Sequence, residues 1–281
     1  METEWLIGET GLYRGSPQGG WTQAGAYAHC INGIAELDSG LVLGSESGCW
    51  FAPAGGRWVQ WHDETLTGVM AIAAAPVGAG VVVASAFGVA TAEETEAGAL
   101  RWRWHSDGLP VNARYSNAVL ADPSDPLRWL VGTEAGVLVR EHEHDRWVYS
   151  SLSRIPVRAL CFAADTFWAG TDGEGIWRSN DGVSWRRAGK RLDDATVYAL
   201  AWTGDSLLAG LEGGLAVGDG VARGGWRRHG PSLRVRSVGA SDGVWLAGAN
   251  PGGLWWSDDR GTRWRRSGFH SVRTIARRAS A

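Results

Sequence analysis

The feature that most constrains the fold of this chain is a block of about forty residues that recurs along its length. In its clearest copy, residues 157–189, an apolar run is followed by a second run ending in Ala-Gly, a short glycine turn, a third apolar run, a polar turn, and a Trp with basic residues. Apolar runs this short, bounded by glycine turns, fit strands and not helices. Each block therefore predicts four strands, which we name A to D in chain order.

The repeat occurs in seven copies. A small residue ends strand B at Gly8, Gly44, Ala84, Gly132, Gly170, Gly210 and Gly248. Strand A is assigned to residues 30–37, 68–76, 116–121, 157–163, 197–202, 235–240 and 271–276. The chain thus begins with a B strand and ends with an A strand, and pairing these two leaves no exposed sheet edge. We expect an all-β, seven-bladed β-propeller of four-stranded antiparallel blades, one domain over residues 1–281, closed by the C-terminal strand A beside N-terminal strands B to D.

Composition agrees with the all-β assignment. The chain contains 41 Gly and 18 Trp, a mixture typical of short strands joined by tight turns. The formal net charge of −3 argues against a protein whose whole surface binds polyanions. Cys30, Cys49 and Cys161 lie in apolar runs and are odd in number, which indicates free thiols in a reducing compartment. The N-terminus lacks the pattern of a secretory signal, so we expect a cytoplasmic location.

One segment raises the question of a membrane span, because residues 65–92 carry no charged side chain. Pro76, Gly78 and Gly80 interrupt it, and it falls in register with two strands of the repeat. We therefore assign the segment to the propeller and expect no membrane span.

A Trp stands near the start of strand D in every repeat. These residues are Trp21, Trp58, Trp102, Trp147, Trp185, Trp226 and Trp264. Repetition at equivalent positions favours packing between outer strands or blades, where an indole buries a large area. We interpret them as structural wedges and not as a sugar-binding surface.

Two turns between strands C and D share a pattern. Ser257, Asp259, Gly261 and Trp264 fit the Asp-box pattern S-x-D-x-G-x-x-W, and Ser179, Asp181 and Trp185 form a copy that is one residue shorter. On these residues the chain resembles the Asp-box (BNR-repeat) β-propellers, a superfamily that includes sialidases, xyloglucanases, sortilin-type receptors and photosystem II assembly-factor propellers. The resemblance implies that the box is structural and lies away from the ligand face. Its hydroxyl and carboxylate satisfy backbone N–H groups, and its glycine adopts a conformation that other residues resist.

The second residue in the core of each strand A is expected at the mouth of the central channel, where propeller ligands usually bind. In blade order these residues are Arg273, Asn32, Met70, Asn117, Arg158, Tyr198 and Arg236. Converging arginines repel one another unless negative charge lies among them. Two sources are open: acids of the turns between strands B and C, or a small anion or partner carboxylate held by bidentate contacts. The turn acids are Glu9, Glu46, Glu134, Asp172, Glu174 and Glu212. All of the mouth residues except Met70 are candidate ligand contacts.

Basic pairs follow the strand-D Trp in three successive repeats. They are Arg186 and Arg187, Arg227 and Arg228, and Arg265 and Arg266. Adjacent strand residues point to opposite faces, so only part of this set can share one patch. The pairs are either solvated charges that protect an edge strand or a docking rim for an acidic partner. Nucleic acid is not the expected partner. The aromatic side chains on which its bases would stack cannot be distinguished in the sequence from the structural Trp residues.

The function expected from these features is a non-catalytic binding or assembly scaffold that docks a protein partner on a propeller face, within a multi-subunit complex. The resemblance to sialidases implies a hydrolase alternative, in which Arg158, Arg236 and Arg273 hold a carboxylate. Tyr198 beside Glu212 would then be the nucleophile, and Asp63 or Asp107 the proton donor. A lectin-like carbohydrate-binding propeller is a further alternative.

No cofactor and no metal are expected. The His residues near the loops between strands D and A lack tight ligand spacing. The run His142-Glu143-His144 is expected at a solvated hairpin tip.

Overall fold

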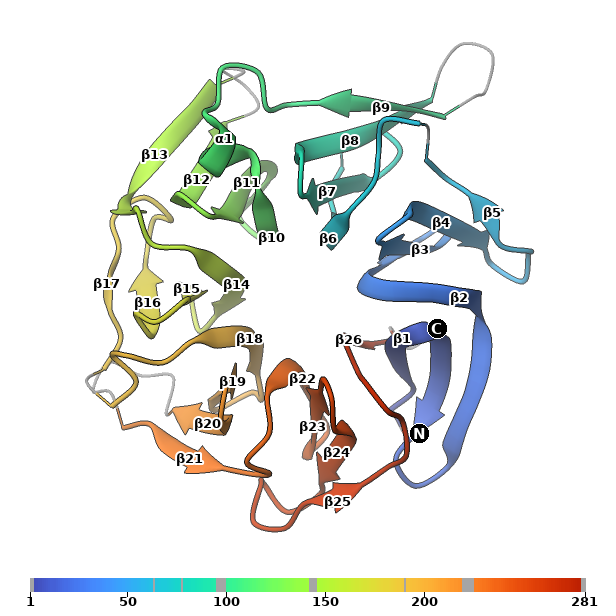
Figure 1. Ribbon diagram of the computed structural model, residues 1–281, viewed down its shortest axis with the longest axis vertical. Helices are drawn as coiled ribbons and strands as arrows, with labels where there is room; N and C mark the ends of the chain where they lie inside the picture. The colour runs from blue at the N-terminus through green and yellow to red at the C-terminus, as the bar shows by residue number, and fades with distance from the viewer. Residues whose placement is uncertain are drawn as a thin grey trace.

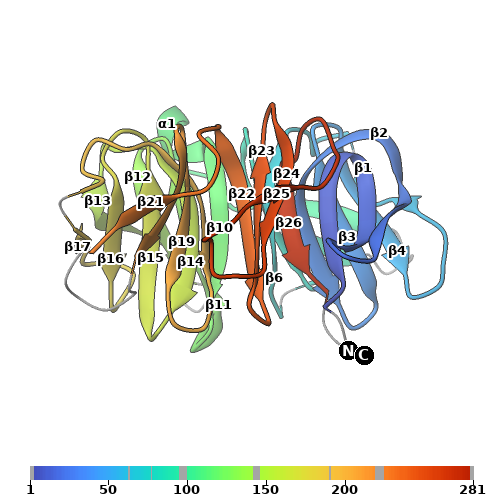
Figure 2. The same ribbon diagram turned by 90° about the horizontal axis from the view of Figure 1, so that it is seen from below.

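The structure is a computed structural model that describes residues 3–278 except 63, 77, 95–99, 142–145, 190 and 219–224. For Tyr27 and Glu94 it describes the backbone but not the side chain. Its sheets stand around a central axis (Figure 1) and form a flat disc in side view (Figure 2). Five antiparallel sheets have four strands each, and the sixth counts as two blades because strand β2 runs from one blade into the next. The expected seven-bladed β-propeller is therefore confirmed.

Blades 3 to 7 each consist of four consecutive strands. Blade 3 contains β6 (Val69–Ala74), β7 (Val81–Ser85), β8 (Gly88–Glu94) and β9 (Leu100–Trp104); blade 4 contains β10 (Ser116–Asp122), β11 (Asp125–Thr133), β12 (Gly136–Glu141) and β13 (Arg146–Ser153). Blade 5 contains β14 (Val157–Ala163), β15 (Thr166–Thr171), β16 (Ile176–Ser179) and β17 (Arg186–Arg187). Blade 6 contains β18 (Val197–Trp202), β19 (Leu207–Leu211), β20 (Gly214–Gly218) and β21 (Arg227–His229); blade 7 contains β22 (Val235–Ser241), β23 (Val244–Ala249), β24 (Gly253–Ser257) and β25 (Arg265–Arg266). One short helix, α1 (Val111–Arg114), precedes β10.

The ends of the chain meet in blade 1. Strand β26 (Thr274–Arg277) pairs antiparallel with the first part of β1 (Trp5–Ser16), so that Gly8 lies opposite Thr274. The second part of β1 pairs with the first part of β2 (Gly20–Leu37). The rest of β2 pairs with β3 (Gly40–Ser45), and β4 (Gly48–Pro53) and β5 (Val59–Gln60) complete blade 2. The expected closure is confirmed, with strands B and C of blade 1 joined into one bent strand.

Close packing between blades explains the small residue that ends strand B. A Cβ atom on Gly170 would lie 2.7 Å from Cγ1 of Val197, and one on Gly210 would lie 2.7 Å from the carbonyl oxygen of Val235. Both valines begin strand A of the next blade. Blade 3 has Ala84 at this position, and strand A of blade 4 begins with the smaller Ser116. The repeat therefore encodes the distance between neighbouring blades.

Five of the strand-D Trp residues link each blade to the blade before it. The indole N–H of Trp21 donates to Ser267 Oγ at 2.9 Å. The other four donate to backbone carbonyl oxygens: Trp58 to Ala24 (3.0 Å), Trp102 to Trp61 (3.1 Å), Trp147 to His105 (2.6 Å) and Trp226 to Ala188 (2.8 Å). Such indoles combine apolar burial with one satisfied polar group. Their structure agrees with the wedge role expected from the sequence.

The other two strand-D Trp residues belong to the Asp-box turns. The N–H groups of Trp264 and Trp185 donate to Gly261 and Gly182 of their own turns, at 3.0 and 2.8 Å. In each turn the Ser hydroxyl donates to the Asp carboxylate at 2.8 Å and accepts from the Gly N–H. Both glycines have positive φ, +82° and +73°. The shorter copy therefore builds the same turn as the full pattern.

The uncharged segment 65–92 contains β6, β7 and the first part of β8. Every residue of β7 is buried, as expected for a strand covered on both faces. Within the described part of the chain, no helix has the length and apolar character needed to cross a bilayer.

Candidate functional site

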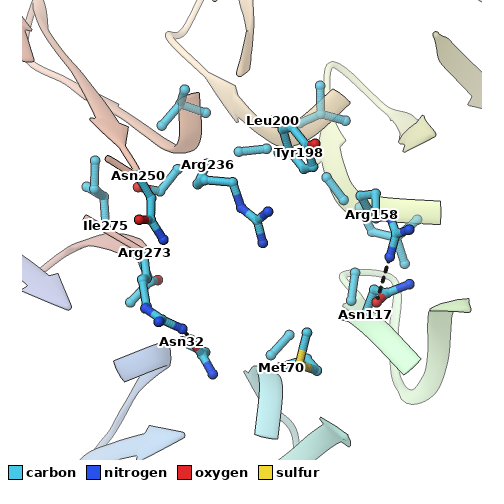
Figure 3. Close-up of a pocket in the computed structure, with 18 of the residues that line it drawn as sticks. Asn32, Met70, Asn117, Arg158, Tyr198, Leu200, Arg236, Asn250, Arg273 and Ile275 are labelled. Atoms are coloured by element: carbon cyan, nitrogen blue, oxygen red, sulfur yellow. Dashed lines mark hydrogen bonds between the residues drawn. The ribbon is translucent and has the colours of Figure 1, made fainter. Parts of the chain in front are cut away.

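A cavity of about 500 Å³ lies at the centre of the ring, and the first residues of strand A line it in every blade. The residues expected at the channel mouth all contribute: Asn32, Met70, Asn117, Arg158, Tyr198, Arg236 and Arg273. Figure 3 shows these side chains arranged around the opening. The arrangement repeats because each of these residues lies near the start of its strand A, beside the axis, and following residues such as Ala159 and Ala199 also line the cavity.

Arg158 is held by two carboxylates. Its guanidinium donates to Glu134 Oε1 and Asp172 Oδ2, both at 2.7 Å, and to Asn117 Oδ1 at 3.3 Å. Burial alone would lower the pKa of Arg158, but Asp172 and Glu134 outweigh it and raise the pKa. The hydrogen bond from Arg158 in turn lowers the pKa of Asp172 below its ordinary value. This arginine is neutralised within the protein.

Arg273 has a similar arrangement on the other side of the opening. Its guanidinium donates to Glu46 Oε1 at 2.8 Å and to Asn32 Oδ1 at 3.3 Å. The amide N–H of Asn32 donates to the carbonyl oxygen of Val69, which begins the next blade. Each of the two asparagines thus joins an arginine to a backbone carbonyl, and internal acids neutralise both arginines.

Arg236 differs from these two arginines. In Figure 3 its side chain extends into the opening. Among the residues that the structure describes, no carboxylate lies within 4.0 Å of its guanidinium, which is positioned over the ring of Tyr198. Partial desolvation by the channel wall lowers the pKa of Arg236, and the charges of Arg234, Arg158 and Arg273 lower it further, although Tyr198 opposes the shift. Within the described residues, the mouth therefore presents Arg236 as a cation without an acidic partner.

Tyr198 and Glu212 form the pair expected from the sequence, with the phenol donating to Glu212 Oε2 at 2.5 Å. Arg234 also binds this carboxylate, through contacts of 2.6 to 2.9 Å. Desolvation and the hydrogen bond to Glu212 raise the pKa of Tyr198, while the hydrogen bonds from Arg234 and Tyr198 lower the pKa of Glu212. Both shifts oppose proton transfer from the phenol to the carboxylate. At neutral pH the phenol of Tyr198 therefore keeps its proton and Glu212 stays ionised.

Two residues of the site were not anticipated from the sequence. Arg234 precedes strand A of blade 7, and Asn250 follows strand B of the same blade and lines the cavity. In Figure 3 the Asn250 amide points toward the opening. The repeat could have indicated Asn250, because it occupies the B-to-C turn that supplies acids in other blades.

The other turn acids have varied partners. Glu9 accepts hydrogen bonds from the backbone N–H groups of His270 and Ser271, both at 2.8 Å. Glu174 forms an ion pair with Arg187. Asp107 is exposed and is not part of the cavity wall, and Asp63 and the run His142-Glu143-His144 lie outside the described residues.

The basic pairs of strand D do not form one uniform patch. Arg187 lies over the ring of Trp177 and pairs with Glu174, and Arg265 lies over Trp256 and pairs with Asp258 at 2.9 Å. Arg266 donates to the carbonyl oxygen of Phe269 at 3.4 Å. Arg186, Arg227 and Arg228 have no carboxylate within 4.0 Å in the part of the chain that the structure describes. The register places Arg186, Arg227 and Arg265 on one side of their strands and the other three arginines on the opposite side.

Comparison with known proteins identifies the fold. No protein-family model matches the sequence, and no curated protein matches it. The extracellular domain of the hybrid two component system BT4673 from B. thetaiotaomicron is similar, with 18% identity and a TM-score of 0.72. The similarity covers 90% of this chain but only 36% of the BT4673 chain. The structure of YCF48 bound to D1 peptide has 16% identity and a TM-score of 0.67 over 91% of this chain and 88% of that chain. A chain of the nidogen/laminin complex has 14% identity and a TM-score of 0.57, covering 78% of this chain and 89% of that chain. At these identities, what the chain shares with its structural neighbours is the β-propeller fold.

Proposed function

We propose that this protein is a non-catalytic scaffold that binds an acidic segment of a protein partner at the channel mouth. The observation that carries the proposal is the Arg236 guanidinium, which extends into the opening without an acidic partner among the described residues, whereas Arg158, Arg234 and Arg273 are all paired. A carboxylate is the group that fits, because it can accept two parallel hydrogen bonds from one guanidinium.

The immediate surroundings of Arg236 favour a hydrogen-bonded carboxylate. Arg158, Arg234 and Arg273 repel the charge of Arg236, and the channel wall partly desolvates it. A bound carboxylate would offset both effects, and the amide of Asn250 would supply a further polar contact. A cavity of about 500 Å³ accommodates a side chain or a short peptide segment.

Two structural neighbours support a protein ligand, since one is YCF48 bound to D1 peptide and another is part of the nidogen/laminin complex. The two Asp-box turns support a relationship to the Asp-box propellers, including the assembly factors among them. We further propose a reducing, cytoplasmic setting, which the three free cysteines support. Cell fractionation of the tagged protein would test this setting, and recovery from an extracellular or periplasmic fraction would contradict it.

Affinity isolation from the native source tests the proposed function. Wild-type protein, Arg236→Ala and the rim double variant Arg227→Ala/Arg265→Ala would be compared as baits at equal loading. We expect the wild type and the rim variant to retain the same partner and Arg236→Ala to lose it. Isolation of the wild type as a lone monomer, or loss of the partner only in the rim variant, would contradict the proposal.

The hydrolase and lectin alternatives have their own tests. Turnover of a fluorogenic sialoside that disappears in Arg236→Ala would establish a hydrolase, and retention on a glycan array without turnover would establish a lectin. We expect neither, because Glu212 is bound by Arg234 and the strand-D Trp residues pack between blades.

A further inference from the structure

Three large apolar side chains are exposed around one sector of the channel-mouth face. Phe87 is 60% exposed in the turn between β7 and β8, and Val111 and Tyr115, in and directly after α1, are 84% and 38% exposed. The turns between strands B and C and the connections between strands D and A lie at the same end of the blades as the mouth. In Figure 2 α1 lies on the upper face of the disc. We name Phe87, Val111 and Tyr115 the apolar sector.

The members of the apolar sector are close together. Helix α1 contacts β8, whose first residue, Gly88, directly follows Phe87. The helix is fixed there by Leu109 and Ala113, which are buried in one cluster with Leu138. Val111 is thereby held on the outside of the turn, next to the strand that follows Phe87.

The apolar sector also borders the cavity. The backbone N–H of Ala86 donates to the carbonyl oxygen of Gly68 at 3.1 Å, two residues before Met70 in the cavity wall. On the other side, the carbonyl oxygen of Tyr115 accepts the N–H of Glu134, the carboxylate partner of Arg158. The sector therefore lies outside the stretch of rim between Met70 and Asn117, in blades 3 and 4. In a ring of seven blades, blades 3 and 4 stand opposite blade 7, which carries Arg236.

We propose that the segment bound at the mouth carries apolar side chains next to its acidic residue, and that these side chains pack on Phe87, Val111 and Tyr115 while the carboxylate reaches Arg236. This inference rests on the proposed function and specifies the partner's chemistry. A small anion would bind in the cavity but leave the sector exposed, whereas a peptide lying across the rim covers both. Exposed large apolar side chains on the same face as a charged arginine are typical of a surface that binds another protein.

The probe for this inference is a phage-displayed library of random linear dodecapeptides, selected on immobilised wild-type protein. The enriched peptides would be synthesised with a fluorescent label, and their affinity would be measured by anisotropy. The variants are Arg236→Gln, Phe87→Ser and Val111→Ser. The matched controls are Arg57→Gln, an exposed arginine on the outer loop of blade 2, and Val59→Ser, whose side chain is 48% exposed on β5. Circular dichroism and melting curves would establish that each variant is folded.

We expect enriched peptides that combine Asp or Glu with Leu, Ile or Phe at a constant spacing. Arg236→Gln and each apolar variant should weaken binding about tenfold, and the controls should change it less than about twofold. Dependence on Arg236 without dependence on Phe87 or Val111 would overturn this inference and leave the proposed function standing. If peptide binding depended on Phe87 and Val111 but not on Arg236, both this inference and the proposed function would be overturned. Absence of enrichment would count against both, and dimerisation of the wild type that Phe87→Ser abolishes would identify a second copy of the chain as the occupant instead.

Discussion

The guanidinium of Arg236 lies over the ring of Tyr198, with 4.6 Å between its central carbon and the ring centroid. A cation–π contact at a position open to solvent stabilises a charge less than a hydrogen-bonded carboxylate does. The charges of Arg234, Arg158 and Arg273 are unfavourable to Arg236, and its pKa is lowered accordingly. The folded ring therefore keeps a charge that is better suited to binding than to stability.

The first prediction concerns the opposite effects of Arg236 on stability and on binding. Arg236→Gln should leave the melting temperature unchanged or raise it by about 1–3 °C, because it removes an unpaired, partly desolvated charge while keeping a polar side chain. Binding of an acidic peptide should fall at the same time. Differential scanning calorimetry would measure the first effect, with Arg57→Gln as the control. A melting temperature lower by several degrees would mean that Arg236 is a structural residue.

Arg158→Gln should have the opposite effect on stability. It leaves the carboxylates of Glu134 and Asp172 facing each other without their shared cation. We expect a loss of about 1 kcal/mol in the free energy of unfolding at pH 7, since the groups are partly exposed and screened. Because Arg158 lowers the pKa of Asp172 in the folded state, the stabilisation is present at neutral pH and disappears as the pH falls through the acidic range.

Urea unfolding at pH 7 and pH 3 would measure this difference, which should shrink at pH 3. Arg273→Gln is the matched comparison, because Arg273 pairs with one carboxylate that is 62% exposed. An equal loss in both variants would contradict the account given for Arg158.

The third prediction concerns the shorter Asp-box turn. Partial burial would raise the pKa of Asp181, but hydrogen bonds from the N–H groups of Ser184 and Val183 and from the Ser179 hydroxyl lower it from 3.8 to about 2. The unfolded chain therefore takes up the proton more readily, so stability from this group is complete above about pH 5 and is lost as the pH falls toward 2. Asp181→Ala should cost about 1 kcal/mol at neutral pH.

Chemical denaturation across pH 2 to 7 would test the Asp181 prediction. The curves of wild type and Asp181→Ala should converge near pH 2. Ser179→Ala offers a second measurement, because it removes the hydroxyl that accepts the Gly182 N–H at 2.8 Å. A constant gap between wild type and Asp181→Ala over the whole pH range would contradict the role of the carboxylate.

The fourth prediction tests the spacing of the blades. Gly170→Ala should destabilise the protein by about 2 kcal/mol, because the new methyl group would lie 2.7 Å from Val197 Cγ1 and 2.9 Å from the Val197 carbonyl oxygen. Gly213→Ala is the matched control, since its nearest neighbour would be the end of the Arg228 side chain at 3.7 Å. Val197→Ala should restore only part of the loss, because the carbonyl oxygen stays in place. Equal melting temperatures for Gly170→Ala and Gly213→Ala would refute this packing argument.

The ring could be predicted from the sequence because its repeat records packing distances directly. Gly170 and Val197 indicate one close contact between two neighbouring blades, and seven equivalent positions indicate a ring of seven blades. The continuous bend of β1 could not be foreseen. Gly11 and Gly15, both in β1, have φ of +105° and +149°, but turns and bent strands use glycine alike.

The site was predictable in position and less so in electrostatics. The repeat identified Arg158, Tyr198 and Arg236 as mouth residues, because the same position near the start of strand A recurs in each copy. Which arginine has an acidic partner depends on side-chain reach across blades: Arg158 extends to Glu134 of the preceding blade and Arg273 to Glu46 of the following one. The sequence therefore left internal and external anions as alternatives, and spacing alone could not separate them.

The contacts that close blade 1 also determine the order in which the protein can fold. Glu9 accepts hydrogen bonds from His270 and Ser271, which follow it by 261 and 262 positions. Contacts this remote in sequence form slowly, and on a ribosome residues 5–8 of β1 must wait for the last repeat before they pair with β26. We expect amide protons of Leu6 and Ile7 to gain protection later than those of Ala169 and Gly170 during refolding, as pulsed hydrogen exchange would show. Simultaneous protection would mean that the ring condenses in a single step.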